Sequence, residues 1–292
     1  MKKIRNVFLL LLCGSFFFIC ALGSSSSSSK YESDSQPNNS AEITKVSFAE
    51  EKIYEGNNVI IYVTGSENTS LGTKINFRIE NNSQLNLNFN VHLSGVNGVM
   101  YGSNIYDMRT EVAAGKKANN SLEIKNSFLK EYSMDKIKYL EILFWAYDND
   151  KMFKSFETGV IKIKSDKFED SNSWIKGTEI YNSSGIRVDF LSFEKDKAKY
   201  LVTNTTGNKI AISFEGISIN DYTVSDTDYD LFDELLLDNT QKVFEISIDK
   251  DFKEKNSIQE VNKIEFYLKY SESETAIFAS NKTGVITTNI NK

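Results

Sequence analysis

One stretch of the sequence occurs twice: Met152-Phe153-Lys154-Ser155-Phe156-Glu157-Thr158-Gly159-Val160-Ile161 returns as Ile277-Phe278-Ala279-Ser280-Asn281-Lys282-Thr283-Gly284-Val285-Ile286, with six of ten positions identical at an offset of 125. Shorter matches precede this pair in the same order, at offsets between 123 and 127: Leu140-Glu141-Ile142 with Ile264-Glu265-Phe266, Ile79-Glu80-Asn81 with Val202-Thr203-Asn204, and Ile53-Tyr54 with Ile180-Tyr181. Offsets that change only between blocks indicate a duplicated unit whose insertions fall in loops. We therefore expect two modules, over residues 45–165 and 178–292, joined by a linker over 166–177.

Within each copy, apolar residues recur at every second position. The clearest runs are Leu87 to Leu93, Leu140 to Ala146 and Ile264 to Tyr270. Alternation of this kind is typical of strands that bury one face. Gly115 and Asn239 stand at equivalent positions in turns, and since both residue types tolerate positive φ, we expect a left-handed turn residue at each. A short helical turn is predicted only at Phe128 to Met134 and at its twin, Phe252 to Ile258.

Short strands, frequent turn signals and roughly 120 residues per copy are typical of β-sandwiches. The fold class predicted is all-β, with two tandem immunoglobulin-like β-sandwich modules. The likeness is one of architecture only. The chain has no cysteines besides Cys13 and Cys20, so neither module can hold the disulfide that joins the sheets of antibody domains.

One motif resembles that of a known family. Val96-Asn97-Gly98, followed by Val112-Ala113-Ala114-Gly115-Lys116-Lys117-Ala118-Asn119, resembles a repeat of exported lipoproteins from Gram-positive bacteria, and Tyr147-Asp148-Asn149-Asp150 is similar to the D-x-D turn of that repeat. The second copy departs from the pattern, with Leu236 to Val243 in place of the turn motif. The resemblance is clearest over residues 75–163 and implies an extracytoplasmic β-sandwich. The family is functionally uncharacterised, so it transfers no active site.

The N-terminus has the pattern of an export signal. Basic residues up to Arg5 precede an apolar run of 16 residues, Val7 to Leu22, broken only by Gly14 and Ser15, which is shorter than the ~20 residues a spanning helix needs. We therefore predict a signal peptide over residues 1–23, and the alternative is an uncleaved N-terminal anchor.

Two processing routes are compatible with this signal. Phe17-Phe18-Ile19-Cys20 resembles a lipoprotein signal, in which Cys20 is lipidated, although Ile19 stands where that pattern usually has a small residue. The rival route is cleavage after Gly23 and free secretion. A flexible Ser/Asn-rich tether is predicted over residues 24–44. The protein is thus expected on the outer side of the membrane, held by a lipid on Cys20 rather than by a transmembrane helix, or secreted.

The charge balance limits the partners. The chain of 292 residues carries 40 acidic and 34 basic side chains, and removal of residues 1–23 would change the net charge from −6 to −9. A nucleic-acid-binding protein needs a basic footprint, so nucleic acid is not expected as a partner. The partner expected is an envelope protein or glycan of unknown identity.

Few groups for catalysis are present. The single histidine is His92, and the cysteines both lie within the predicted signal, which excludes a zinc site of several His or Cys ligands in the mature chain. No P-loop, dinucleotide fingerprint or nucleophile elbow occurs. We therefore expect no catalytic residue, no metal and no cofactor. His92 alternates with apolar residues along its strand and is expected on the exposed face.

An acidic stretch runs from Asp221 to Asp238. Its Asp226-x-Asp228-x-Asp230 segment is similar to the start of a calcium loop, but Leu231 and Leu237 stand where such a loop needs Gly and Glu. A solvated acidic loop is expected here, with a weak calcium site as the alternative. Asp148-x-Asp150 is interpreted as a turn rather than a ligand pair.

The candidate binding face lies on the strand from Tyr139 to Tyr147. Opposite its core residues, this strand carries Tyr139, Glu141, Leu143, Trp145 and Tyr147, whereas the second copy has Lys263, Glu265, Tyr267, Lys269 and Ser271. Exposed apolar patches mark contacts, and Trp and Tyr are enriched in binding hot spots. The candidate residues are Tyr139, Leu143, Trp145 and Tyr147. The alternatives are burial against the other module or the linker, which carries Phe168, Trp174 and Ile175, and cover by loops of the same module.

These observations favour a non-catalytic surface protein. It would bind an envelope or extracellular protein, peptide or glycan, or act structurally. One alternative is a carbohydrate-binding module that uses the aromatic strand face. A second is an envelope hydrolase that uses carboxylates alone, since a glycosidase needs only two.

Overall fold

The computed structural model of the chain describes residues 42–148, 155–224, 234–272 and 280–290, without the side chains of residues 103–107. The predicted signal peptide, Cys20 and nearly all of the tether lie outside these residues. So do Asp226 to Asp230 of the acidic stretch and Asp150. The described chain is all-β, as the alternation of apolar residues predicts, and its helices are two of six residues each.

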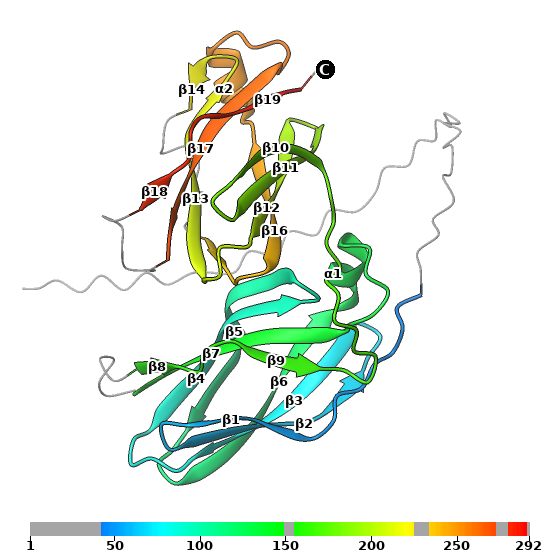
Figure 1. Cartoon of the computed structure of the whole chain (residues 1–292), viewed down its shortest axis with the longest axis vertical. Coiled ribbons are helices and arrows are strands. Elements are labelled where there is room, and N and C mark those ends of the chain that lie inside the picture. The colour runs from blue at the N-terminus through cyan, green and yellow to red at the C-terminus, as the bar shows by residue number, and fades with distance from the viewer. Residues whose placement is uncertain (1–41, 149–154, 225–233, 273–279, 291–292) are drawn as a thin grey trace, which may run out of the picture. The chain divides into compact units, whose positions relative to one another are not determined.

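The N-terminal half of the described chain consists of two antiparallel sheets (Figure 1). Its elements are β1 (Glu51–Gly56), β2 (Val59–Asn68), β3 (Gly72–Asn81), β4 (Leu87–Val96), β5 (Val99–Val112), β6 (Lys116–Lys125), α1 (Asn126–Glu131), β7 (Tyr139–Asp148), β8 (Ser155–Glu157) and β9 (Ile161–Lys164). One sheet has the order β1-β2-β3-β6. The strands β5-β4-β7-β8, with β9 also paired to β7, belong to a larger sheet of nine strands that continues into the C-terminal half. Phe77 of β3 and Phe144 of β7 meet edge to face at 5.7 Å in the buried space between the sheets.

The C-terminal half repeats this arrangement. Its elements are β10 (Thr178–Ser183), β11 (Ile186–Glu194), β12 (Lys197–Asn204), β13 (Ile210–Ile219), β14 (Tyr222–Thr223), β15 (Glu234–Leu236), β16 (Thr240–Ser247), α2 (Lys250–Lys255), β17 (Lys263–Ser271), β18 (Asn281–Lys282) and β19 (Ile286–Asn289). β10, β11, β12 and β16 correspond to β1, β2, β3 and β6, while β13 and β17 correspond to β4 and β7. Tyr200 of β12 and Phe266 of β17 meet at 4.9 Å in a second buried core.

Equivalent side chains make the same hydrogen bonds in both halves. They serve backbone groups at turns and strand ends, a common role of Asn and Thr. The pairs are Asn81 and Asn204, whose Nδ2 atoms donate to nearby carbonyls; Asn97 and Asn220, whose Oδ1 atoms each accept from two successive backbone N–H groups; and Thr158 and Thr283, whose Oγ1 atoms accept from the backbone of β7 and β17. Gly115 has φ of 67° and Asn239 has φ of 55°, which confirms the predicted left-handed turn residues.

β4 differs from the sequence prediction, because a β-bulge reverses its faces. Its pairing with β7 shifts between Val91 and Leu93, which leaves His92 as the extra residue. Up to Val91 the odd-numbered residues enter the core of the N-terminal half, whereas Leu93 points the other way and joins the core of the C-terminal half. The predicted placement of Leu93 with Leu87 is therefore wrong. β4 is buried on both faces.

The two halves meet through a strand pair and the linker. Val99 of β5 pairs in parallel with Gln241 of β16. The Gln241 side chain accepts from the backbone N–H of Ile175 at 3.1 Å and donates to the Ile175 carbonyl at 3.2 Å, so it binds the linker as a strand neighbour would. The described residues form one compact unit.

Candidate functional site

The outer face of β7 is positioned by strict alternation along the strand. Leu140, Ile142, Phe144 and Ala146 point into the core and are all buried. Their neighbours must therefore point away from that core. We call Tyr139, Glu141, Leu143, Trp145 and Tyr147 the β7 outer face.

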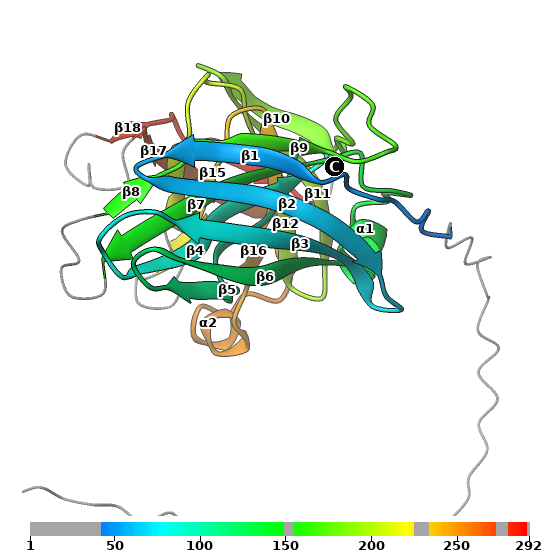
Figure 2. The ribbon, with the colours of Figure 1, turned by 90° about the horizontal axis from the view of Figure 1, so that it is seen from below.

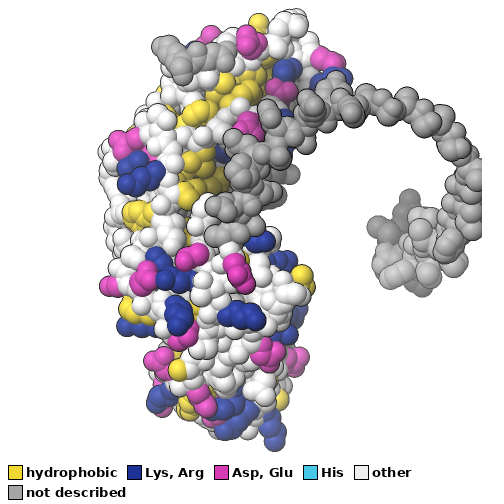
Figure 3. Space-filling model, turned by 90° about the vertical axis from the view of Figure 1, so that its right-hand side faces the viewer, with side chains coloured by type: hydrophobic (Ala, Val, Ile, Leu, Met, Phe, Trp, Pro, Cys, Tyr) yellow, Lys and Arg dark blue, Asp and Glu magenta, His cyan; other side chains and the backbone are white. Residues whose placement is uncertain are grey.

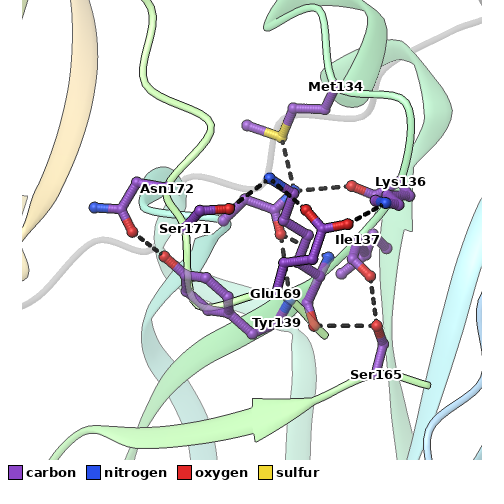
Figure 4. Close-up of polar contacts among 10 residues, drawn as sticks. Met134, Lys136, Ile137, Tyr139, Ser165, Glu169, Ser171 and Asn172 are labelled. Carbon is purple, nitrogen blue, oxygen red and sulfur yellow. Dashed lines mark hydrogen bonds and ion pairs between the residues drawn. The ribbon is translucent and has the colours of Figure 1, made fainter. Parts of the chain in front are cut away.

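Tyr139 lies under the linker at one end of this face. Its hydroxyl donates to Asn172 Oδ1 at 2.5 Å, the edge of Phe168 meets its ring, and Lys162 Nζ lies 3.9 Å from the ring centroid. Figure 4 shows Tyr139 and Asn172 facing one another beside the linker. Burial raises the pKa of the Tyr139 hydroxyl, so it stays a neutral donor. Tyr139 is thus a structural contact with the linker.

The linker is held against the start of β7 by further polar contacts. Lys136 Nζ lies 2.6 Å from Glu169 Oε1, and Lys138 Nζ donates to Ser171 Oγ at 3.0 Å (Figure 4). The linker also passes close to the turn between β4 and β5. That turn depends on Gly98, whose φ is +83° and where an added Cβ would lie 2.8 Å from Trp174 Nε1. The glycine of the Val96-Asn97-Gly98 motif therefore allows the linker to approach closely.

Leu143 lies at the middle of the face and is buried between the halves. It pairs with Leu93 on the neighbouring strand β4. Leu143, Leu93 and Met100 all belong to the apolar cluster of the C-terminal half. The bulge at His92 is what makes this contact, because it turns Leu93 outward to join Leu143. This part of the β7 outer face joins the two halves.

Glu141 lies between Tyr139 and Leu143 on the β7 outer face. Burial raises the pKa of its carboxyl group, and the Asp238 charge acts in the same direction while Lys162 opposes it. Among the described residues, Glu141 Oε2 has no hydrogen-bond partner. A carboxylate here is destabilised by the loss of water.

Trp145 and Tyr147 occupy the other end of the face and are half-buried. Their rings lie 4.8 Å apart at an interplanar angle of 34°, and the His92 ring lies 6.2 Å from Trp145. Asn90, opposite Trp145 on β4, is 9 % exposed, and its Oδ1 has no hydrogen-bond partner among the described residues. Two half-buried aromatic rings thus lie beside an unsatisfied amide oxygen that is shielded from solvent.

Alternation predicts His92 on an exposed face, but the structure places it on a covered one. It is 9 % exposed, and its Nε2 lies 4.0 Å from Glu157 Oε1. The prediction failed because β4 is covered on both sides and because His92 is the bulge residue. Glu157 also pairs with Lys209 of the C-terminal half at 3.2 Å.

A second region, not anticipated from the sequence, lies on the outer face of the β2-β3-β6 sheet. A hollow of about 530 Å³ opens there, lined by polar side chains that include Lys74, Asn76, Arg78 and Asn119. Figure 2 shows these strands side by side, toward the viewer. Alternation in β3 from Lys74 to Glu80 predicts a polar face, but no motif distinguishes it from an ordinary solvated face.

Acidic and basic side chains are interspersed on the side of the molecule in Figure 3. Among the described residues, no three His, Cys, Asp or Glu side chains gather in a way that could hold a metal ion. No described helix is long and apolar enough to cross a membrane.

No protein-family model matches the chain, and no curated protein sequence is similar to it.

Proposed function

We propose that the chain is an exported, non-catalytic surface protein of two tandem immunoglobulin-like β-sandwich modules, held outside the membrane by a lipid on Cys20, and that it binds an envelope or extracellular protein, peptide or glycan. The strand order supports this fold. In each half the chain crosses to the second sheet after β3 or β12 and returns as β6 or β16 beside the strand it left. That return is a Greek-key connection of the kind found in immunoglobulin-like sandwiches.

Export is supported by the N-terminal segment, where basic residues, a short apolar run and Cys20 precede a serine-rich stretch. The non-catalytic proposal rests on the side chains available. With one histidine, buried in β4, and no cysteine after Cys20, the chain offers no thiol beyond the predicted signal and no exposed imidazole for catalysis.

The observation that carries the binding proposal is the half-buried pair of Trp145 and Tyr147. The equivalent residues of β17 are Lys269 and Ser271, so the duplicated module does not need aromatic rings here. Tyr139 and Leu143 are covered by the linker and the C-terminal half, whereas the rings of Trp145 and Tyr147 are only half-covered. Two aromatic rings in that position are suited to contact with an external partner.

Photo-crosslinking from the full chain in its native cells tests this proposal. A photoreactive side chain at position 147 is expected to give an adduct of one defined mass, identifiable as a protein, peptide or glycan, and Trp145→Ala is expected to abolish that adduct. The matched control places the same photoreactive group at position 271. No adduct at position 147, or the same adducts from both positions, would count against binding at this face.

A carbohydrate-binding module is the second candidate, favoured by Asn90. Its Oδ1 is unsatisfied and lies beside Trp145 but is shielded from solvent, so a sugar hydroxyl can reach it only after a side chain over it moves, while the half-buried Trp145 ring is open to pack on the sugar face. If this is correct, Trp145→Ala and Asn90→Leu each reduce oligosaccharide binding. Peptide adducts that are unaffected by Asn90→Leu would favour the first candidate.

A further inference from the structure

The hollow on the outer face of the β2-β3-β6 sheet is formed by strand register. Tyr62, Arg78 and Asn119 are paired across the three strands, and Asn76 pairs with Ser121 in the adjoining row. Side chains in one register row point to the same face of a sheet. The hollow is therefore built on a hydrogen-bonded framework rather than on loops.

Its cation Arg78 already faces two carboxylates, one on its own strand and one just before β1. Arg78 Nε lies 3.1 Å from Glu80, its Nη1 lies 3.7 Å from Glu50, and its guanidinium lies 4.4 Å above the Tyr62 ring. A hydrogen bond from Lys117 lowers the pKa of the Glu80 carboxyl, which keeps it ionised. Since positive charge here is balanced by negative charge, a ligand needs no net charge to fit.

Lys74 lies between two glutamates in the strand register. Its register partners on the two neighbouring strands are Glu67 and Glu123. The hollow thus gains no excess positive charge at this end either, so nothing in it selects an acidic ligand.

The uncharged groups of the hollow are free to bind. Among the described residues, the side chains of Thr64, Asn76, Asn119 and Ser121 make no hydrogen bond to the protein. Asn120 shows the contrast, because its Nδ2 donates to Thr110 Oγ1 at 2.6 Å. An amide offers one acceptor and two donor hydrogens, and a hydroxyl offers both functions. This set matches a ligand rich in hydroxyl groups.

Other ligand classes fit this surface poorly. The backbone of β3 is paired on both sides, so a peptide cannot add to it as a strand. Helical and proline-rich peptides need apolar or aromatic grooves, whereas the ring of Tyr62 is already covered by Arg78.

A second copy of this chain is also a poor fit, as the C-terminal half shows. There the residues equivalent to Arg78 and Asn119 are Leu201 and Val243, and they are covered within the same chain, with Leu201 fully buried and Val243 packed against the core of the N-terminal half. A face used for module docking is thus apolar, and the hollow is not.

We propose that this hollow is a binding site for a neutral oligosaccharide. Asn76 and Asn119 hydrogen-bond the sugar hydroxyls, with Thr64 and Ser121 beside them, and Arg78, stacked on Tyr62, forms one wall. The site lies on the opposite sheet from the β7 outer face and does not depend on the function proposed there.

Binding is tested with the full chain on an array of neutral and acidic oligosaccharides, followed by titration with the best neutral binder. We expect neutral oligosaccharides to bind, and Asn76→Ala and Asn119→Ala each to weaken binding about tenfold. Lys199→Ala, at the C-terminal position equivalent to Asn76, is expected to leave binding unchanged. Asn119→Asp keeps the size of the side chain but removes its donors, and it should weaken binding without altering the thermal unfolding midpoint.

Amide chemical-shift changes locate the site independently of any variant. Changes confined to β2, β3 and β6 support the proposal. Changes on β4 and β7 would overturn it while leaving the function of the β7 outer face intact. A lack of binding to every neutral oligosaccharide, or binding of acidic ones alone, would also overturn it.

Discussion

The outer faces of β7 and β17 have the same backbone setting but opposite surroundings. In β7, Leu143 is buried with Leu93 between the halves, whereas the equivalent Tyr267 of β17 is half-buried and covers Gly216, with Lys282 Nζ 3.7 Å from its ring centroid. Lys269 beside it pairs with Glu215 at 3.3 Å. The C-terminal half therefore keeps the core pattern of the N-terminal half and changes the outer face, so that part of the β7 face is a contact between the halves while the β17 face is half-buried.

The two faces are expected to differ most in how much a truncated side chain lowers the free energy of unfolding, and Leu143 is the residue with the largest expected loss. Leu143→Ala removes buried apolar contacts on both sides of the junction, and we expect it to lower the free energy of unfolding by about 2–4 kcal/mol. Tyr267→Ala, the matched change on β17, is expected to cost about 1 kcal/mol, because that ring is partly solvated. Urea unfolding followed by tryptophan fluorescence measures both. Equal losses would mean that the two faces are energetically alike.

The second difference concerns Gln241 of β16 and its counterpart Lys117 of β6. Gln241→Ala removes two hydrogen bonds to Ile175 and one to Thr203, and leaves backbone groups of the linker unpaired, at a cost of about 1–3 kcal/mol. We expect faster proteolysis within residues 166–177. Lys117→Ala removes an exposed lysine from Glu80, which Arg78 also pairs, and is expected to change the free energy of unfolding less than Gln241→Ala does. Unchanged proteolysis of Gln241→Ala would show that the linker does not depend on this clamp.

A third difference separates Glu141 from Glu265, which pairs with Lys263 at 3.2 Å. The raised pKa of Glu141 means that folding favours its protonated form, so its penalty is absent below the pKa of the unfolded chain and develops as pH rises through the folded pKa. Glu141→Gln is therefore expected to stabilise the protein at pH 7 by about 1 kcal/mol and to have no such effect at pH 3. Glu265→Gln should show no stabilisation at either pH. Thermal unfolding at both pH values would decide, and an effect of Glu141→Gln that does not change with pH would contradict this assignment.

Sequence patterns predicted the repeat, the all-β class, the two short helical turns and the positive φ at Gly115 and Asn239, because these depend on local spacing and on residue type. The reversal of β4 was not predictable, since a β-bulge adds one residue without a distinctive residue type, and His92 and Leu93 were misplaced together. The division of the β7 outer face depends on contacts between segments far apart in the chain. The hollow combines ordinary polar residues from three strands, so only their register reveals it.

The smallest expected effect comes from the two short helices. Asp249 caps α2 by accepting from the backbone N–H of Asp251 at 2.6 Å, while the equivalent Lys125 has the same extended backbone before α1 and makes no side-chain cap. An aspartate at this position satisfies a free N–H and favours the positive end of the helix. Lys125→Asp is thus expected to raise the free energy of unfolding by about 0.5 kcal/mol, and Asp249→Ala to lower it by about 1 kcal/mol. Paired urea titrations measure both changes, and a loss of stability in Lys125→Asp would show that the basic residue has a role at the end of β6 that outweighs the missing cap.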